Sequence, residues 1–119
     1  MIAVIFEVLP HPDRRDDYFA IAGDLRPLLA GIDGFISIER FESLSEPGKI
    51  LSLSFWRDEV SVTEWRNTEQ HRLAQQQGRG GIFRDYRLRI ADVSRDYGMF
   101  ARDQSPADSR ARHDDGTAS

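Results

Sequence analysis

The apolar segment at the start of the chain constrains the fold more than any other feature of the sequence. Residues 2–9 are all apolar except Glu7, and Pro10 and Pro12 follow them. Because proline cannot donate to a sheet, these two residues mark the end of a strand. A short continuous apolar run is typical of a strand that is buried on both faces or nearly so. We therefore expect residues 2–9 to form a central strand.

A helix and a hairpin are predicted after this strand. Over residues 13–32 the apolar positions recur at intervals of three and four, which predicts a helix with one apolar stripe. Pro27 lies inside the stripe and removes one backbone donor, so a kink is expected near the helix end. Residues 35–43 and 50–57 are joined by a turn rich in Ser, Pro and Gly, and together they predict an antiparallel hairpin.

A second helix and a last strand complete the pattern. Asp58 is a suitable N-cap, and the helix is expected to run to about Gln77, with a break near residues 65–67. The last strand is expected over residues 82–98. Its apolar positions change parity after Ile90, which predicts a β-bulge midway along the strand.

The order of these segments is β-α-β-β-α-β. It predicts an α+β, ferredoxin-like fold, with a four-stranded antiparallel sheet and both helices on one face. The first and last strands carry apolar residues on both parities, so the other face needs cover. Burying such surface is worth roughly 25 cal/mol per Å², and we therefore expect a homodimer through the sheet face. Residues 1–100 are expected to form this domain, and residues 101–119 a polar C-terminal tail.

Composition excludes several classes of function. The formal net charge is −4 and there is no basic run, so no nucleic-acid partner is expected. The absence of cysteine excludes disulfides and a cysteine nucleophile. His11, His71 and His113 are too far apart in sequence for a metal-ligand motif, so no metal site is expected. The apolar N-terminal run is too short for a signal peptide or a membrane span, which predicts a cytoplasmic protein without membrane contact.

The candidate functional residues are concentrated in the second predicted helix, which carries Trp65, Asn67, His71, Arg72 and Gln75. His71 has an ordinary pKa of about 6.5 and could accept a proton at neutral pH, or it could bridge packed elements. Trp65 could stack on a flat ligand or belong to the core. Asn67 could orient a substrate oxygen or cap the second half of a broken helix. Arg72 or Asn67 could steady an oxyanion.

Two strand residues are also candidates for contact with a substrate. Glu7 is the only charge in the most apolar strand, and an unpaired buried carboxylate is costly. It is expected either to pair with Arg72, Arg87 or Arg89 or to point into a polar cavity. Tyr86, on the last strand, could donate a hydrogen bond to a ligand or could pack in the core.

Four sequence motifs carry a resemblance to a known family. They are GFISIERF in the second strand, SLSFWRDE before the second helix, W-x5-HR-x-AQ-x2-GR along it, and FRDYRLRIADVSRDYG in the last strand. With them the chain resembles the antibiotic biosynthesis monooxygenase family of dimeric α/β barrels over residues 1–100. The resemblance implies a barrel-like dimer with a pocket in each subunit between the sheet and the helices.

The same resemblance implies several possible activities. Some relatives oxidise aromatic polyketides with O2 and without metal or flavin; others degrade haem, act on quinols or have no known activity. The polyketide-oxidising branch has a Trp and, six residues later, a side chain that handles a proton, which Trp65 and His71 match. The haem-degrading branch uses an Asn of the first strand, where this chain has Glu7, and a wider spacing between its Trp and His.

The leading hypothesis is therefore a monooxygenase without cofactor that acts on a small aromatic or polyketide-like compound. His71 and Trp65 are its expected catalytic residues, and Asn67, Arg72, Glu7 and Tyr86 are the expected substrate contacts. One alternative is a homodimer of the same fold that binds a small ligand without catalysis. Another is a haem-binding or haem-degrading relative with His71 as axial ligand.

Overall fold

The computed structural model describes residues 1–113. Its main strands and helices are β1 (Ile2–Pro10), α1 (Arg15–Ala30), β2 (Phe35–Glu42), β3 (Ile50–Trp56), α2 (Glu59–Arg66), α3 (Glu69–Gln77), β4 (Phe83–Asp92) and α4 (Ala107–His113). Two short turns of helix complete the list: η1 (Pro12–Arg14) and η2 (Gly78–Ile82).

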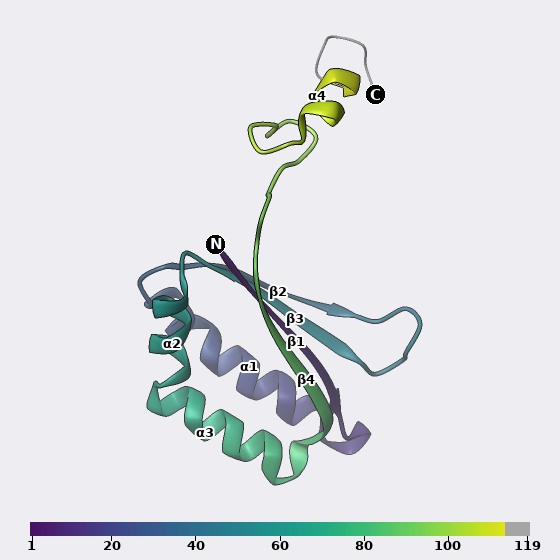
Figure 1. Ribbon diagram of the computed structural model, residues 1–119. Coiled ribbons are helices and arrows are strands. Elements are labelled where there is room, and N and C mark those ends of the chain that lie inside the picture. Colours follow the sequence, from purple (N-terminus) through teal and green to yellow (C-terminus); the bar gives the residue numbers. More distant parts are fainter. Residues whose placement is uncertain (114–119) are drawn as a thin grey trace.

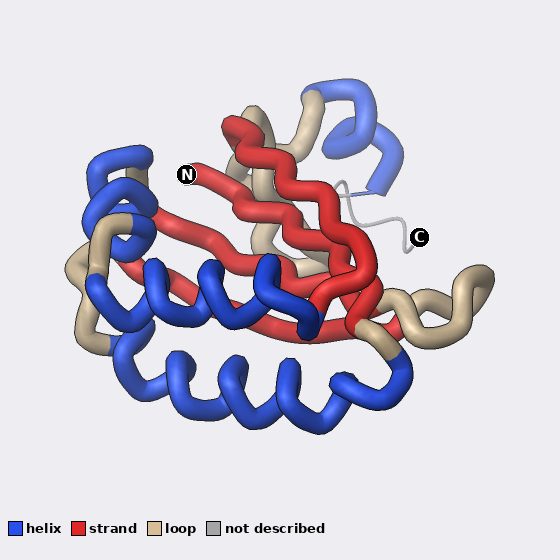
Figure 2. The backbone as a smooth tube through the Cα atoms, turned by 90° about the horizontal axis from the view of Figure 1, so that it is seen from below, coloured by secondary structure: helices blue, strands red, loops and turns tan. Residues whose placement is uncertain are grey.

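The four strands form one antiparallel sheet in the order β2-β3-β1-β4. This order, with the β-α-β-β-α-β sequence of elements, confirms the predicted α+β, ferredoxin-like fold. As predicted, β1 is an inner strand. Helices α1, α2 and α3 lie on one face of the sheet, and none of these three covers the other face (Figures 1 and 2).

Two apolar clusters join the helices to the sheet. The first contains Ile2, Leu29, Trp56, Val62 and Trp65. The second contains Val8, Tyr18, Ile50 and Ile82. Both clusters draw on the same face of β1 and β3, because alternate residues of a strand point to the same side.

The inner strand β3 is unusual because its helix-facing side carries small polar residues at its centre. Ser52 and Ser54 are buried on that side, between Ile50 and Trp56. Leu51, Leu53 and Phe55 alternate with them and therefore lie on the uncovered face of the sheet. The two serines leave space between the two apolar clusters.

The second helix is divided, as the sequence predicts. Asp58 caps α2 and accepts from the backbone N–H of Ser61 at 2.9 Å and from its Oγ at 2.7 Å. These bonds, together with Arg57, lower the pKa of the Asp58 carboxyl to about 2. The cap of α3 is Thr68, whose Oγ1 accepts from His71 N at 3.2 Å. Asn67, the expected cap of the second half, instead ends α2.

The last strand differs from the prediction in its length and its bulge. β4 ends at Asp92 rather than at residue 98, because β1 begins at Ile2 and offers no partner beyond the bond from Val93 N to Met1 O at 3.0 Å. The irregular register lies at the opposite end, next to Pro10, which has no N–H to donate. Ile90 pairs regularly with Val4, so there is no bulge midway.

The chain after β4 leaves the sheet and runs away from the rest of the molecule (Figure 1). It carries exposed Tyr97, Met99 and Phe100 before α4. Ser105 is buried here, and its Oγ donates to Arg102 O at 2.6 Å. The predicted polar tail, residues 101–119, thus contains one short helix, and residues 114–119 lie outside the described part of the chain.

Candidate active site

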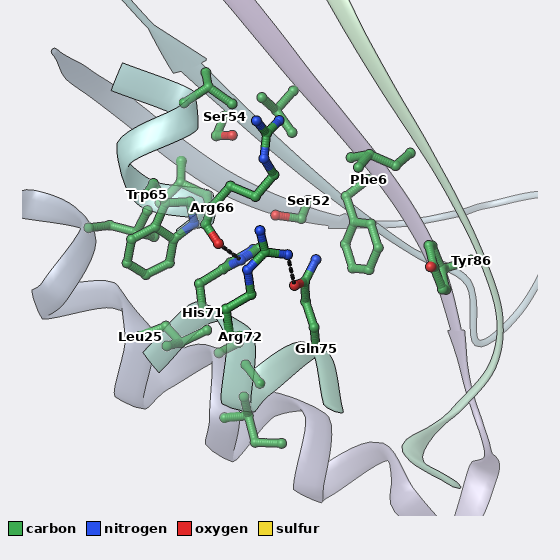
Figure 3. A pocket seen from close by; sticks show the side chains of 18 of the residues that line it. Phe6, Leu25, Ser52, Ser54, Trp65, Arg66, His71, Arg72, Gln75 and Tyr86 are labelled. Carbon is green, nitrogen blue, oxygen red and sulfur yellow. Dashed lines mark hydrogen bonds between the residues drawn. The ribbon is translucent and has the colours of Figure 1, made fainter. Parts of the chain in front are cut away.

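A pocket of about 560 Å³ lies between the sheet and helices α1, α2 and α3. Cavities of roughly 300–1,000 Å³ are typical of small-molecule sites. Much of its wall is apolar and belongs to, or adjoins, the two core clusters. The apolar side chains include Val4, Phe6, Ile21, Leu25, Leu29, Ile38, Val62, Trp65, Leu88 and Ile90. Ser52 and Ser54 form part of the sheet side (Figure 3).

Trp65 and His71 lie side by side at this pocket. Their ring centroids are 5.3 Å apart, with the rings inclined at 59°. Trp65 is buried and His71 is half-buried. The break between α2 and α3 makes this pairing possible, because positions six apart on one continuous helix would point about 120° apart.

Thr68 fixes the local geometry of that break. Its Oγ1 donates to Trp65 O at 2.8 Å and accepts from His71 N at 3.2 Å. One hydroxyl thus links the last turn of α2 to the first turn of α3. An N-cap residue has an extended backbone and a side-chain oxygen that accepts from the helix, and Thr68 at the junction meets both requirements.

The tautomer of His71 follows from its hydrogen bond. Nδ1 lies 3.2 Å from the backbone oxygen of Arg66, and a carbonyl oxygen only accepts, so Nδ1 carries the proton (Figure 3). Nε2 of the neutral ring is then an acceptor. The ring has the form that a general base needs.

The surroundings of His71 keep the ring neutral. Burial lowers its pKa below the ordinary 6.5, and the cations of Arg72 and Arg66 lower it further. The hydrogen bond to Arg66 O raises the pKa, but by less than burial lowers it. At neutral pH the imidazole is therefore free to accept a proton.

Arg72 and Tyr86 also line the pocket, from α3 and β4. Arg72 donates to Gln75 Oε1 at 3.2 Å and to Asn67 Oδ1 at 2.7 Å. The Tyr86 hydroxyl accepts from Arg79 Nη1 at 3.2 Å, and its ring packs 5.6 Å from Phe6. The structure thus brings together four of the six predicted site residues.

Glu7 and Asn67 are outside the lining. Glu7 lies on the opposite face of the sheet, where it accepts from Arg89 Nη1 at 3.2 Å and lies 3.8 Å from Lys49 Nζ. The sequence left two alternatives for Glu7, an ion pair with an arginine or a place in a polar cavity. The structure shows the ion pair, and its partner Arg89 is one of the three arginines expected. Asn67 is exposed at the helix break, and its Oδ1 accepts from Arg72 rather than facing the cavity.

Sequence reasoning missed several polar residues of the lining: Arg40, Ser52, Ser54, Arg66 and Arg79. Arg40 and Ile38 have the same parity on β2, and both line the pocket. Ser52 and Ser54 have the same parity as the apolar residues Ile50 and Trp56. This pattern was the sequence signal that the two serines lie on the same face as those residues. Parity alone does not tell which side of a hairpin the helices will cover.

Metal clusters and membrane-spanning helices are both absent from the described residues 1–113. No three or more His, Cys, Asp and Glu side chains in this part of the chain gather as a metal site would require. No helix in the same range has both the length and the apolar character needed to cross a membrane.

Comparison with known proteins points to one family. A family model described as antibiotic biosynthesis monooxygenase matches residues 1–77. The jasmonate monooxygenase ABM of Pyricularia oryzae is 56% identical over 94 residues, which cover 79% of this chain and 44% of that protein. The present chain therefore spans less than half the length of this relative. The uncharacterized protein YqjZ of Bacillus subtilis is 27% identical over 93 residues, covering 78% of this chain and 79% of its own.

The fold is also shared with solved structures. The structure of Rv0793 from Mycobacterium tuberculosis superposes with a TM-score of 0.73 at 20% identity, covering 82% of this chain and 98% of that one. At this level of identity the match shows the fold alone.

Proposed function

The chain belongs to the antibiotic biosynthesis monooxygenase family, and from that premise we propose that it is a monooxygenase acting on a small organic substrate in the pocket. The observation that carries the proposal is the His71–Trp65 pair. A neutral imidazole, whose Nε2 has no hydrogen bond within residues 1–113, lies against an indole at the wall of a largely apolar cavity. That combination can remove a proton from a substrate held against the aromatic ring.

The proposed reaction needs no cofactor, because an electron-rich carbanion or phenolate can itself reduce O2. His71 Nε2 takes a proton from an activated CH₂ group, and the resulting anion reacts with O2 to form a C–O bond. The peroxide anion takes the proton back from His71. Loss of the second C–H proton then breaks the O–O bond, leaving a carbonyl group and releasing one water molecule. The substrate supplies all the electrons, so R₂CH₂ and O2 give R₂C=O and H₂O.

The other lining residues have supporting roles in this proposal. Trp65 holds the flat part of the substrate by stacking. Arg72, with its guanidinium at the cavity, stabilises the oxyanion that develops during the reaction (Figure 3). Tyr86 is a further substrate contact, oriented by its bond with Arg79.

Two classes of compound are candidate substrates for assay. The aromatic and polyketide-like class is implied by the resemblance to the polyketide-oxidising relatives, whose spacing Trp65 and His71 match. The name of the relative from Pyricularia oryzae adds jasmonate, which is the substrate named for that protein. Both are small cyclic compounds of a size that suits a 560 Å³ pocket.

We also propose that the active form is a homodimer through the uncovered sheet face. That face presents Ile5, Leu51, Leu53 and Phe55 side by side on β1 and β3, with Phe41 43% exposed on β2. No helix of the described residues covers them in one copy of the chain, and a second sheet would remove them from water.

Oxygen uptake tests the function directly. EDTA-treated protein is given a panel of anthrones, naphthols and jasmonate, and O2 consumption is followed for wild type, His71→Ala and His11→Ala. Loss of a general base typically costs about 10²–10⁴-fold in rate, so His71→Ala should lose most activity. His11 lies outside the pocket lining, and its variant should match wild type.

The result that would overturn the catalytic role is equal uptake by His71→Ala and wild type on the same substrate. Tight binding of a panel compound with no uptake would instead favour the alternative, a homodimer that binds ligands without catalysis.

A further inference from the structure

The charged residues of the pocket lining are all of one sign. Arg40, Arg66, Arg72 and Arg79 line the cavity, and no Asp or Glu within residues 1–113 does. The whole chain has the opposite balance, with 20 acidic residues against 16 Lys and Arg. Composition therefore does not explain the local excess of positive charge.

The pocket arginines also differ from other arginines in their partners. Arg66 donates to Thr63 Oγ1 at 3.5 Å, Arg72 to Gln75 and Asn67, Arg79 to Tyr86, and Arg40 to Tyr18. All of these acceptors are neutral, and within residues 1–113 none of the four arginines forms an ion pair. Outside the lining, carboxylates pair with Arg14, Arg15, Arg57 and Arg89.

Arg40 is the best placed of the four to hold an anion. It is half-buried on strand β2, whereas the other three are exposed on the helical side. Only its Nε has a hydrogen bond within the described residues, to Tyr18 Oη at 3.4 Å, so both terminal nitrogens remain available. Glu42, which follows Arg40 by two residues on β2, forms its ion pair with Arg15 at 3.3 Å instead of with Arg40.

The sheet register extends a binding surface from Arg40 into the pocket. Arg40 lies opposite Ser52, Ser52 opposite Phe6, and Phe6 opposite Leu88. Because strands are about 4.8 Å apart, this row is roughly 14 Å long. It passes from a cation over a small serine to two apolar side chains, and His71 and Trp65 face it from the helices.

We propose that the pocket takes an amphipathic organic anion, with a carboxylate on the terminal nitrogens of Arg40 and an apolar body along Ser52, Phe6 and Leu88. The planar guanidinium fork matches a carboxylate in two parallel hydrogen bonds. Arg66, Arg72 and Arg79 raise the positive potential of the pocket and attract the anion. The inference rests on the proposed function, because it names the substrate class of the same site.

Binding measured without turnover tests this inference. Under argon, quenching of tryptophan fluorescence reports ligand entry, because Trp56 and Trp65 both line the pocket. The probes are jasmonate and its methyl ester, and phenylacetate and its methyl ester. Each acid should bind about tenfold or more tightly than its ester, the difference expected of a charge-assisted pair.

Variants identify the residue responsible. Arg40→Gln should abolish the preference for the acid while leaving affinity for the ester unchanged, which also shows that the pocket is intact. Arg40→Lys keeps the charge without the fork and should retain part of the preference. The control Arg26→Gln removes the same charge from an exposed site on α1 outside the lining. This variant should retain the full preference for the acid.

Equal affinity for acid and ester, or no binding of either acid at millimolar concentration, would overturn the inference. So would an acid preference that survives Arg40→Gln. Because no oxygen is present, an absence of oxygenase activity leaves this result unaffected, and the two proposals can fail separately.

Discussion

The chemistry available to His71 depends on three features of its immediate surroundings. The carbonyl of Arg66 holds the proton on Nδ1, burial disfavours the charged ring, and the nearby guanidinium groups of Arg66 and Arg72 do the same. Trp65 covers one side of the imidazole. The side chain is thus kept neutral with Nε2 as its acceptor, which is the state that the proposed proton transfer requires.

The lowered pKa predicts the pH dependence of the reaction. The base must be neutral, so kcat/KM should be constant at neutral pH and fall in acid, with a midpoint below the ordinary value of 6.5. The imidazole of His71, assigned by its loss in His71→Gln, should titrate over the same range in NMR spectra. A midpoint above 6.5 in either measurement would contradict the account.

The same shift has a consequence for stability. Because the folded state holds the proton on His71 less tightly than the unfolded chain does, the unfolded state binds more protons as the pH falls through 6.5. His71 therefore lowers the free energy of unfolding as the pH falls below 6.5. Above that pH the ring is neutral in both states, and His71 causes no loss of stability.

The interrupted helix is the element on which the site depends. α2 delivers Trp65 from its last turn and α3 delivers His71 from its first turn, and Thr68 bonds to both segments. A single straight helix would turn one of these two side chains away from the cavity.

Replacing the cap should disturb both stability and activity. Thr68→Ala removes the acceptor for His71 N and the donor to Trp65 O, and loss of an N-cap typically costs about 1 kcal/mol. Urea unfolding should show this loss, and the rate should fall because His71 is less well held. Thr68→Ser keeps the hydroxyl and should stay close to wild type. If Thr68→Ala and Thr68→Ser were equally stable, the cap would have no such role.

Elements and site residues differ in how far the sequence alone predicts them. The helix stripe, the hairpin, Asp58 as N-cap and the helix break follow from local patterns, and the structure confirms them. Trp65 and His71, which both line the pocket, were singled out because they lie close together in one segment. Arg40 and Ser52 were missed, and Glu7 was left with alternatives, because their surroundings depend on register between strands and on which face the helices cover.

At the scale of the whole molecule, the uneven covering of the sheet is the main feature. Three helices pack on one face of the sheet (Figure 2), and the pocket lies between them and the strands. The other face has the apolar residues Ile5, Leu51, Leu53 and Phe55, with the Glu7–Arg89 pair beside them. Stable interfaces bury about 800 Å² on each partner, and we propose that these apolar residues form the centre of such an interface. This surface is the basis of the proposed homodimer.

A charge at the centre of that face should separate the subunits. Leu53 lies between Ile5 and Glu39 in the sheet register, so Leu53→Lys places an ammonium group in the proposed interface. Sedimentation velocity should show a dimer for wild type and a monomer for Leu53→Lys, both with native circular dichroism. The control Leu28→Lys changes a leucine that is 42% exposed on α1 and should remain dimeric. A monomeric wild type, or a dimeric Leu53→Lys, would contradict the proposal.

The central claim, that this pocket is a monooxygenase site in which His71 is the base, is tested most directly with ¹⁸O2. EDTA-treated protein is allowed to turn over an active substrate from the uptake panel under labelled oxygen, and the product is examined by mass spectrometry. The account predicts one ¹⁸O atom in each product molecule, the other in water, and loss of labelled product with His71→Ala. Product with two labelled atoms or none, or labelling that persists in the variant, would contradict it.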